Sequence, residues 1–246
     1  MTIPAGARRL AVTVDGRQLS GWTWGAGKPV LLVHGWGGQS ADMLPVASAL
    51  SPESCSPVLV DMPAHGSSPG RETSLVEWMR VIRAIVATVG PLHGIVAHSL
   101  GATAAVLAAA DGLPVDRLVL LAPAGSLAPY FAQYRQALGI KGRLAQRLVA
   151  EVERRVGLSI AQLDATRAAQ RVSANALVLH GSDDRQIPSA QGRAVAEGLS
   201  AGQFVERPGL KHRTLLSDPE SIRLVTEFLC TATLGTTTVS SPPLAR

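Results

Sequence analysis

The sequence has few of the residues that build disulfide or metal frameworks. Of its 246 residues only two are cysteines, Cys55 and Cys230, which lie far apart and match no metal-ligand spacing. The histidines show no H-E-x-x-H pattern, the spacing with which a helix presents two ligands to zinc. We therefore expect two separate thiols, no metal site and no organic cofactor, although the sequence also permits a disulfide.

Lysine is scarce as well, with three residues against twenty arginines and a net charge of +5. Charged residues make up 17% of the chain and apolar residues 46%, the balance of an ordinary globular protein. The arginine bias alone identifies no partner, because a nucleic-acid-binding protein needs its charge clustered on one surface. We expect no nucleic-acid partner, and the composition leaves the oligomeric state open.

The chain also lacks the apolar runs that mark secretion or membrane insertion. Its first residues, MTIPAGARRL, contain no apolar signal core, so the cytoplasm is the default location. The segment from Ala84 to Ala110 carries no charge and could span a bilayer by length. Glycine, proline and histidine interrupt it, which is typical of a buried strand, turn and helix. We expect no stable membrane insertion.

Short apolar runs alternate with segments of helical character. A parallel strand buried on both faces reads as such a run. We expect these strands at Pro29–Gly35, Ser56–Pro63, Gly94–Ser99 and Arg117–Pro123, with further ones from Ala176 and, more weakly, from Gln203. Helices are expected at Ser40–Leu50, Ser74–Val89, Leu100–Ala110 and Asp218–Leu229. This alternation predicts an α/β fold whose mostly parallel central sheet carries helices on both faces.

Local signals mark several element ends. Asp15-Gly16 favours a tight hairpin between the strands Arg9–Val14 and Gln18–Trp24. Ser40 is a plausible N-cap for the first helix. Ser74 with Glu77 three residues later matches a capping box.

Two stretches break the alternation. Residues 125–172, here called the cap segment, are an insertion between two predicted strands, with helical patterning over 127–138 and 140–156. Residues 231–246 are rich in Thr, Ser and Pro and are expected to form a disordered tail. The remaining residues, 1–124 and 173–230, would form the core domain.

The cap segment also holds the chain's excess charge. It contains eight basic and three acidic side chains, so its surplus of five positive charges equals that of the whole chain. The surplus could attract an anionic substrate or an anionic membrane surface. The alternative is a solvated, arginine-rich helix face with i,i+4 ion pairs and no partner. The sequence favours this second interpretation.

Chemistry-bearing side chains lie where the predicted strands end, at the edge where open parallel sheets place their functional loops. The segment Ala97–Gly101 reads A-H-S-L-G. It resembles the G-x-S-x-G elbow of the α/β-hydrolase family, in which a nucleophilic serine lies on a sharp turn from strand to helix. Ala97 replaces the first glycine. The resemblance extends from about Arg9 to Leu229, and it makes Ser99 the candidate nucleophile. The alternative is that Ser99 serves as the N-cap of the helix at Leu100.

The family's chain order is serine, acid, histidine. Of six histidines, only His180 and His212 follow Ser99, and only His212 also follows a strand-end carboxylate, so His212 is the candidate base. In this family the acid lies three residues after a strand-ending glycine, with a proline four residues later. Gly181 and Pro188 give Asp184 that spacing, and Asp183 is the alternative.

The resemblance also suggests how an oxyanion would be bound. The loop H-G-W-G-G at residues 34–38 is similar to the family's first βα loop, which points to the backbone amides of Trp36 and Leu100. The segment D-M-P-A-H-G-S-S at residues 61–68 resembles a structural loop of the family. We expect Asp61 and His65 to fix that loop rather than to act in chemistry.

The resemblance implies a serine hydrolase that cleaves a small carboxylic ester through an acyl-enzyme, without metal or cofactor. A cap in this family usually shapes the substrate pocket, so we expect this pocket to be lined by Trp36, Tyr130, Phe131 and Tyr134. Thioesterase, lactonase, amidase, carbon–carbon hydrolase and cofactor-free peroxidase activities would use the same residues. Proteins of this fold that bind ligands without turnover are a further alternative.

Overall fold

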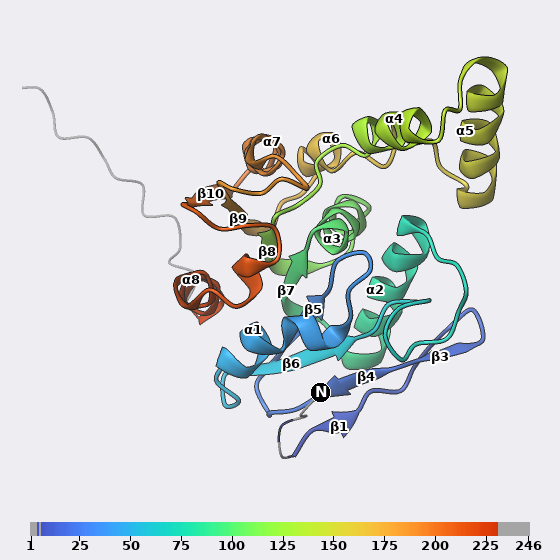
Figure 1. Ribbon diagram of the computed structural model, residues 1–246. Helices are drawn as coiled ribbons and strands as arrows, with labels where there is room; N and C mark the ends of the chain where they lie inside the picture. Colours follow the sequence, from blue (N-terminus) through green and yellow to red (C-terminus); the bar gives the residue numbers. More distant parts are fainter. Residues whose placement is uncertain (1–3, 5, 231–246) are drawn as a thin grey trace, which may run out of the picture.

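The computed structural model describes residues 4 and 6–230 and shows an eight-stranded sheet in the order β1-β4-β6-β5-β7-β8-β9-β10 (Figure 1). From β6 to β10 all neighbours are parallel, and β4 joins β6 and β1 antiparallel. The prediction of a mostly parallel sheet is therefore confirmed. The strands are β1 (Arg8–Arg9), β4 (Gly21–Thr23), β5 (Lys28–Val33), β6 (Cys55–Val60), β7 (Leu92–His98), β8 (Val115–Leu121), β9 (Asn175–Gly181) and β10 (Gly202–Arg207).

Helices cover both faces of this sheet, as predicted. Alternate strand residues explain the two layers: Leu31 packs into one core and Leu32 into the other. The first core contains residues of α2 (Leu75–Val89), α3 (Leu100–Ala110), α6 (Ala165–Ala169) and α7 (Ser189–Gly198). The second contains residues of α1 (Leu44–Ala49) and α8 (Pro219–Cys230).

The uncharged segment from Ala84 to Ala110 divides among the end of α2, strand β7 and helix α3. This division confirms the predicted strand, turn and helix. No helix in the described part of the chain combines the length and the apolar character needed to cross a bilayer.

The N-terminal strands differ from the expected single hairpin. A two-stranded sheet forms from β2 (Val12–Val14) and β3 (Arg17–Leu19), joined through Asp15 and Gly16, both with positive φ. The flanking strands β1 and β4 instead pair with each other and extend the main sheet. Residues 10–11 and 20 lie outside the strands, so the outer strands β1 and β4 can join one sheet while the inner strands β2 and β3 form another.

One of the two expected helix caps is wrong, and the other is confirmed in part. Ser74 caps α2, since its hydroxyl accepts from the Glu77 amide at 3.2 Å. The Glu77 carboxylate does not close a capping box, because it pairs with Arg17 instead. Ser40 is not an N-cap: it is the first residue of a 3-10 turn, η1 (Ser40–Met43), and its amide donates to Asp61.

The cap segment contains α4 (Ala128–Ala137), α5 (Gly142–Val156) and the short α6, between β8 and β9. The first two confirm the predicted helical stretches to within a few residues. Helices α6 and α7 were not anticipated. Figure 1 shows α5 standing out from the body at one end of the molecule. The expected disordered tail, 231–246, lies outside the described residues.

Both thiols are free, as expected, but they lie near each other in the fold. Cys55, at the start of β6, and Cys230, at the end of α8, line one surface depression. Burial raises the pKa of the Cys55 thiol. Folding thus brings together two residues that are 175 positions apart in the chain.

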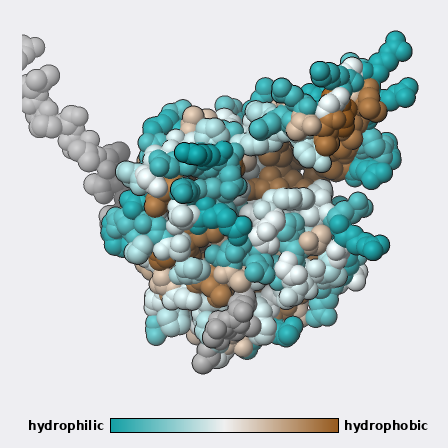
Figure 2. All heavy atoms as spheres, viewed as in Figure 1, coloured by the Kyte–Doolittle hydropathy of each residue, from teal (hydrophilic) through white to brown (hydrophobic). Residues whose placement is uncertain are grey.

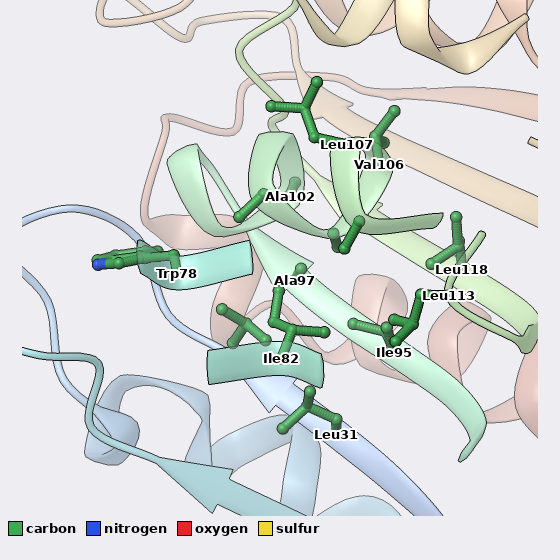
Figure 3. Close-up of a cluster of buried hydrophobic side chains, with 14 of the residues drawn as sticks. Leu31, Trp78, Ile82, Ile95, Ala97, Ala102, Val106, Leu107, Leu113 and Leu118 are labelled. Atoms are coloured by element: carbon green, nitrogen blue, oxygen red, sulfur yellow. The ribbon is translucent and has the colours of Figure 1, made fainter. Parts of the chain in front are cut away.

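Small residues let α3 approach the sheet closely. Ala97 and Ala102 are fully buried beside Ile82 of α2, and Figure 3 shows them at the centre of this core. Gly101 is more constrained, since a Cβ there would lie 2.3 Å from the His34 carbonyl oxygen and 2.9 Å from Val33. The last glycine of the elbow is therefore required by the contact between α3 and the end of β5.

Replacing Gly101 with alanine should destabilise the protein, because backbone rather than a flexible side chain blocks the new methyl group. Overpacking of this kind costs about 1–3 kcal/mol. Urea unfolding monitored by circular dichroism would measure the loss. Gly101 lies within helix α3, where alanine is ordinarily more stable than glycine by about 1 kcal/mol. An unchanged or increased stability of Gly101→Ala would therefore contradict the steric explanation.

Candidate active site

The turn between β7 and α3 holds Ser99 in a strained conformation. Its φ of 54° and ψ of −122° lie outside the regions that L-residues prefer. The Ser99 amide donates to the Leu121 carbonyl oxygen at 2.8 Å, which fixes the turn against β8. Ser99 occupies the N-cap position of α3, yet its side chain makes no capping hydrogen bond. The hydroxyl is therefore left for another partner.

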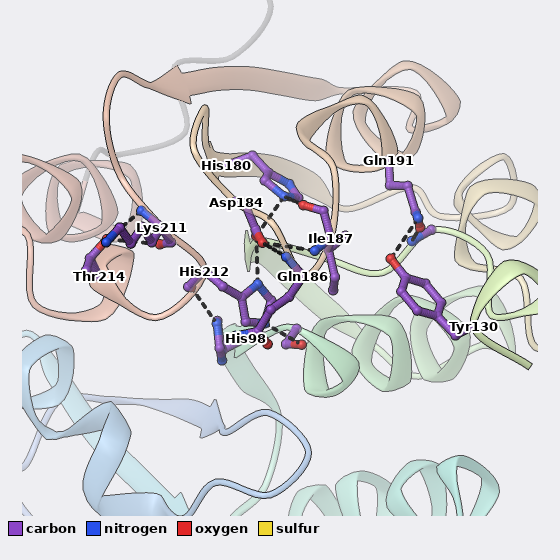
Figure 4. A network of polar contacts seen from close by, with 12 residues as sticks. His98, Tyr130, His180, Asp184, Gln186, Ile187, Gln191, Lys211, His212 and Thr214 are labelled. Carbon is purple, nitrogen blue, oxygen red and sulfur yellow. Dashed lines mark hydrogen bonds and ion pairs between the residues drawn. The ribbon is translucent and has the colours of Figure 1, made fainter. Parts of the chain in front are cut away.

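That partner is His212, which follows β10 in a loop. Its Nε2 lies 2.9 Å from Ser99 Oγ, and its Nδ1 lies 2.7 Å from Asp184 Oδ2 (Figure 4). Asp184 follows β9, so the three side chains come from the carboxyl ends of three strands. Asp183 is exposed, and its carboxylate accepts from Ser182 instead. Of the two predicted acids, the structure brings Asp184 to the histidine.

The Asp184 carboxylate is buried and surrounded by donors. Its Oδ1 accepts from the amides of Gln186 and Ile187, both at 2.9 Å. Its Oδ2 lies near His212 and also 3.2 Å from His180 Nε2. Burial by itself would raise the pKa of Asp184, but hydrogen bonds from His180, His212 and Ile187 outweigh it and hold the pKa below its usual range. Asp184 is thus ionised.

His180 is a second imidazole on the same carboxylate, and sequence reasoning assigned it no role. The ring is fully buried. Its Nε2 lies 2.9 Å from the Ile187 carbonyl oxygen, so this nitrogen carries the hydrogen that donates to the carbonyl and to Asp184. Nδ1 is buried against Gly192 and has no hydrogen-bond partner among the residues that the structure describes. Its position one residue before the strand-ending Gly181 is the signal that could have indicated it.

His98 lies directly before Ser99 and supports the loop of His212. Its Nε2 lies 3.0 Å from the His212 carbonyl oxygen, and the two rings are 4.7 Å apart. Burial, together with the nearby His212, lowers the pKa of His98 to about 4. His98 is therefore neutral near pH 7 and donates to the carbonyl without adding a charge beside His212.

The loop at residues 34–38 lies directly beside the serine. A Cβ on Gly35 would be 3.0 Å from Ser99 Cβ, so only glycine allows this approach. His65 Nε2 accepts from the Gly37 amide at 3.0 Å, and His34 Nε2 accepts from the Met62 amide at 3.0 Å. The backbone on both sides of Trp36 is therefore held in place.

The neighbouring loop at residues 61–68 is fixed by Asp61. This carboxylate accepts from the amides of Ser40 and Ser67 at 2.7 and 2.8 Å. The structure confirms the expectation that Asp61 and His65 fix these loops.

An apolar cavity of about 530 Å³ is lined by Leu100, the residue directly after Ser99. Trp36 and the predicted pocket residues Tyr130, Phe131 and Tyr134 of α4 also line it. Val152 and Val156 of α5 contribute to the same wall. The structure thus brings all four predicted pocket residues to one cavity between the body and the cap segment.

The start of the cap segment is tied to α7 through one side chain. Gln191 Nε2 donates to the Tyr130 hydroxyl at 2.8 Å, and Gln191 Oε1 accepts from the Gly125 amide at 2.9 Å (Figure 4). This contact fixes Tyr130 within the cavity wall.

Among residues 4 and 6–230, the His, Cys, Asp and Glu side chains form no cluster of three that could hold a metal ion.

Comparison with known proteins gives the same architecture. Residues 28–216 match the model of the α/β hydrolase fold family. An uncharacterized protein of Mycobacterium tuberculosis strain H37Rv, Rv2307c, is 30% identical over 241 residues, which cover 89% of this chain and 75% of that protein.

Solved structures of lower identity share the fold. A monoacylglycerol lipase of Paleococcus ferrophilus has a TM-score of 0.70 and 24% identity, covering 86% of this chain and 98% of the lipase. Est816, described as an enzyme that degrades N-acyl homoserine lactones, has a TM-score of 0.72 and 15% identity, covering 89% of this chain and all of Est816. With the family match over most of its length, the chain belongs to the α/β hydrolase fold family.

Proposed function

We propose that the protein is a serine hydrolase that cleaves carboxylic esters with an apolar acyl group. The observation that carries this proposal is the continuous series of contacts from Ser99 Oγ through the His212 ring to Asp184, on a strained strand–helix turn. Such a series activates a hydroxyl that is a weak nucleophile at its free pKa.

In the proposed reaction, Ser99 Oγ attacks the ester carbonyl carbon while His212 Nε2 takes the hydroxyl proton. The tetrahedral intermediate collapses, the carbon–oxygen bond to the alcohol breaks, and His212 returns the proton to the departing alkoxide. Water then attacks the acyl carbon while His212 takes its proton, the bond from that carbon to Ser99 Oγ breaks, and His212 returns the proton to Ser99 Oγ as the acid leaves. The Asp184 carboxylate holds the ring orientation and stabilises the imidazolium that forms.

Backbone amides would stabilise the negative charge on the carbonyl oxygen. Leu100 is the first residue of α3, so its amide has no intrahelical acceptor four residues earlier. The loop containing Trp36 lies beside the serine and is held by His34 and His65. Each such donor is worth about 3 kcal/mol of transition-state stabilisation.

The cavity favours an apolar acyl group. Its wall combines aromatic and aliphatic side chains from Trp36, Tyr130, Phe131 and Tyr134 with the valines of α5. Burying each methylene of an acyl chain there contributes about 0.8 kcal/mol. We therefore expect kcat/KM to rise with acyl length until the cavity is filled.

A lactone or thioester would use the same groups, and Est816, a structure of the same fold, is described as degrading a lactone. Comparing a p-nitrophenyl ester with a matched thioester and an N-acyl lactone separates these substrates. A ligand-binding protein without turnover would hydrolyse none of them.

Ser99→Ala should abolish hydrolysis of p-nitrophenyl esters, from acetate to palmitate, because the attacking atom is removed. The expected loss in kcat is roughly 10⁴-fold or more. Labelling with a fluorophosphonate probe, read by intact-protein mass, should vanish in the same variant. Ser189→Ala, at the start of α7, serves as the control and should retain both activities. Full turnover in Ser99→Ala would sink the proposal.

The two neighbouring aspartates provide an internal test of the acid. Asp184→Asn should lower kcat by roughly 10³- to 10⁴-fold, since the amide cannot stabilise the imidazolium. Asp183→Asn should change kcat less than about three-fold, because its exposed carboxylate accepts a hydrogen bond from Ser182 and none from His212. Steady-state kinetics on one ester measures both variants. Similar losses of kcat in the two variants would contradict the assignment of Asp184 as the acid.

Neutral His98 should make stability pH-dependent. Its folded pKa of about 4 lies below the ordinary 6.5, so between these values the unfolded chain binds more protons. The contribution of neutral His98 to the free energy of unfolding is complete above pH 6.5. It falls as the pH drops towards 4, by about 3 kcal/mol in all. Urea unfolding of the wild type and His98→Asn, from pH 7 to 4.5, measures it. The stability difference between the two should shrink as pH falls, and a constant difference would refute this assignment.

A further inference from the structure

The exposed large apolar side chains gather around one end of the molecule. In the described chain these are Trp36, Tyr134, Leu138 and Leu144, with exposed fractions of 55, 64, 54 and 63%. Three of them fall within residues 134–144 of the cap segment, and Trp36 lies on the cavity that the cap segment covers. Single exposed apolar residues are ordinary, whereas a concentration of them marks an interaction surface.

The helices that carry these residues are not covered by the body. Helix α4 has no buried residue, and Ala145 is the one buried residue of α5. Leu144, Leu148, Val152 and Val156 form one apolar stripe on α5 at intervals of four residues. Val152 and Val156 line the cavity, while Leu144 lies beyond it. Figure 2 shows this apolar face of the projecting helix above a hollow, with hydrophilic side chains on its outer side.

Uncompensated positive charge lies at the same end. Lys141, Arg143 and Arg147 are exposed, and within the described residues none of their side chains has an ion-pair or hydrogen-bond partner. The other end of α5 differs, since Arg154 and Arg155 both pair with Glu151 at 2.8 and 2.7 Å. Of the two ends of α5, the first, which carries Leu144 and follows Leu138 at the end of α4, therefore combines apolar exposure with cations that have no partner among the described residues.

We propose that this end of the cap segment binds peripherally to the surface of an anionic lipid bilayer. We call it the cap tip, made up of Tyr134, Leu138, Lys141, Arg143, Leu144 and Arg147. Apolar and aromatic side chains enter the interface while the flanking cations meet the lipid phosphates, the pattern of an interfacial amphipathic helix. Each cation near such a surface strengthens binding by roughly five-fold.

Charge favours a lipid surface over a second copy of this chain. The cap segment has five more basic than acidic side chains, so two cap tips facing one another would repel. Nucleic acid would satisfy the cations but not the exposed leucines.

If the protein is the ester hydrolase proposed above, the cap tip would place the open apolar cavity at the lipid interface. An acyl chain could then reach Ser99 without crossing water.

Vesicle co-sedimentation of the Ser99→Ala protein tests binding without any chemistry. The probes are phosphatidylcholine vesicles and vesicles containing about 30% phosphatidylglycerol. Lys141→Gln with Arg143→Gln should weaken anionic-vesicle binding by roughly 25-fold. The matched pair, Arg8→Gln with Lys28→Gln, removes the same charge from β1 and the start of β5 and should change it less than about two-fold. Leu138→Gln with Leu144→Gln should also weaken binding.

Raising NaCl from 50 to 500 mM should release the protein, because exposed charges are screened. Each of the three double variants, made in the protein with Ser99 present, should hydrolyse p-nitrophenyl acetate like wild type. A loss of vesicle binding is then distinguishable from a loss of the proposed activity. Equal binding to both vesicle types, equal effects of the two charge pairs, or a cap-mediated dimer in analytical ultracentrifugation without vesicle binding would each overturn the proposal.

Discussion

The buried carboxylate of Asp184 is the charge around which the carboxyl edge of the sheet is arranged. An ionised carboxylate out of water is costly unless donors surround it. Here two amides of its own loop, His212 and His180 supply them. The loops after β9 and β10 are thereby fixed relative to each other, and the His212 ring is oriented towards Ser99. The geometry of the candidate site follows from satisfying this one charge.

Rigid and loosely packed parts are divided between the two sides of the cavity. On the body side, Gly35 and Gly101 lie too close to their neighbours to carry a Cβ, and the side chains of His34 and His65 hold the loops. On the cap side, α4 buries no residue and is tied to α7 through Gln191 and Tyr130. This contrast suits a site in which reacting groups need fixed positions while the apolar wall accommodates varied chains.

Much of the fold could be read from the sequence because its signals are local. Apolar runs ending in glycine or histidine gave the parallel strands, and Pro219 marked the start of α8. Ser40 was misjudged as a cap because its amide partner, Asp61, lies 21 residues away. Helices α6 and α7 were missed because each is short and stabilised by packing against its neighbours and the sheet.

The sequence by itself, through its resemblance to the family's motifs and chain order, indicated Ser99, His212 and Asp184 as candidates, with Asp183 as the alternative acid, since the elbow and the strand-end spacing are properties of neighbouring residues. Only the tertiary structure showed that the Asp184 carboxylate contacts His212 while that of Asp183 does not, placed His180 on the same carboxylate, and brought Cys55 and Cys230 to one depression. It also showed that the basic end of the cap segment carries exposed leucines. These facts depend on distances between residues far apart in the chain, which arise only when the strands pair and the helices pack.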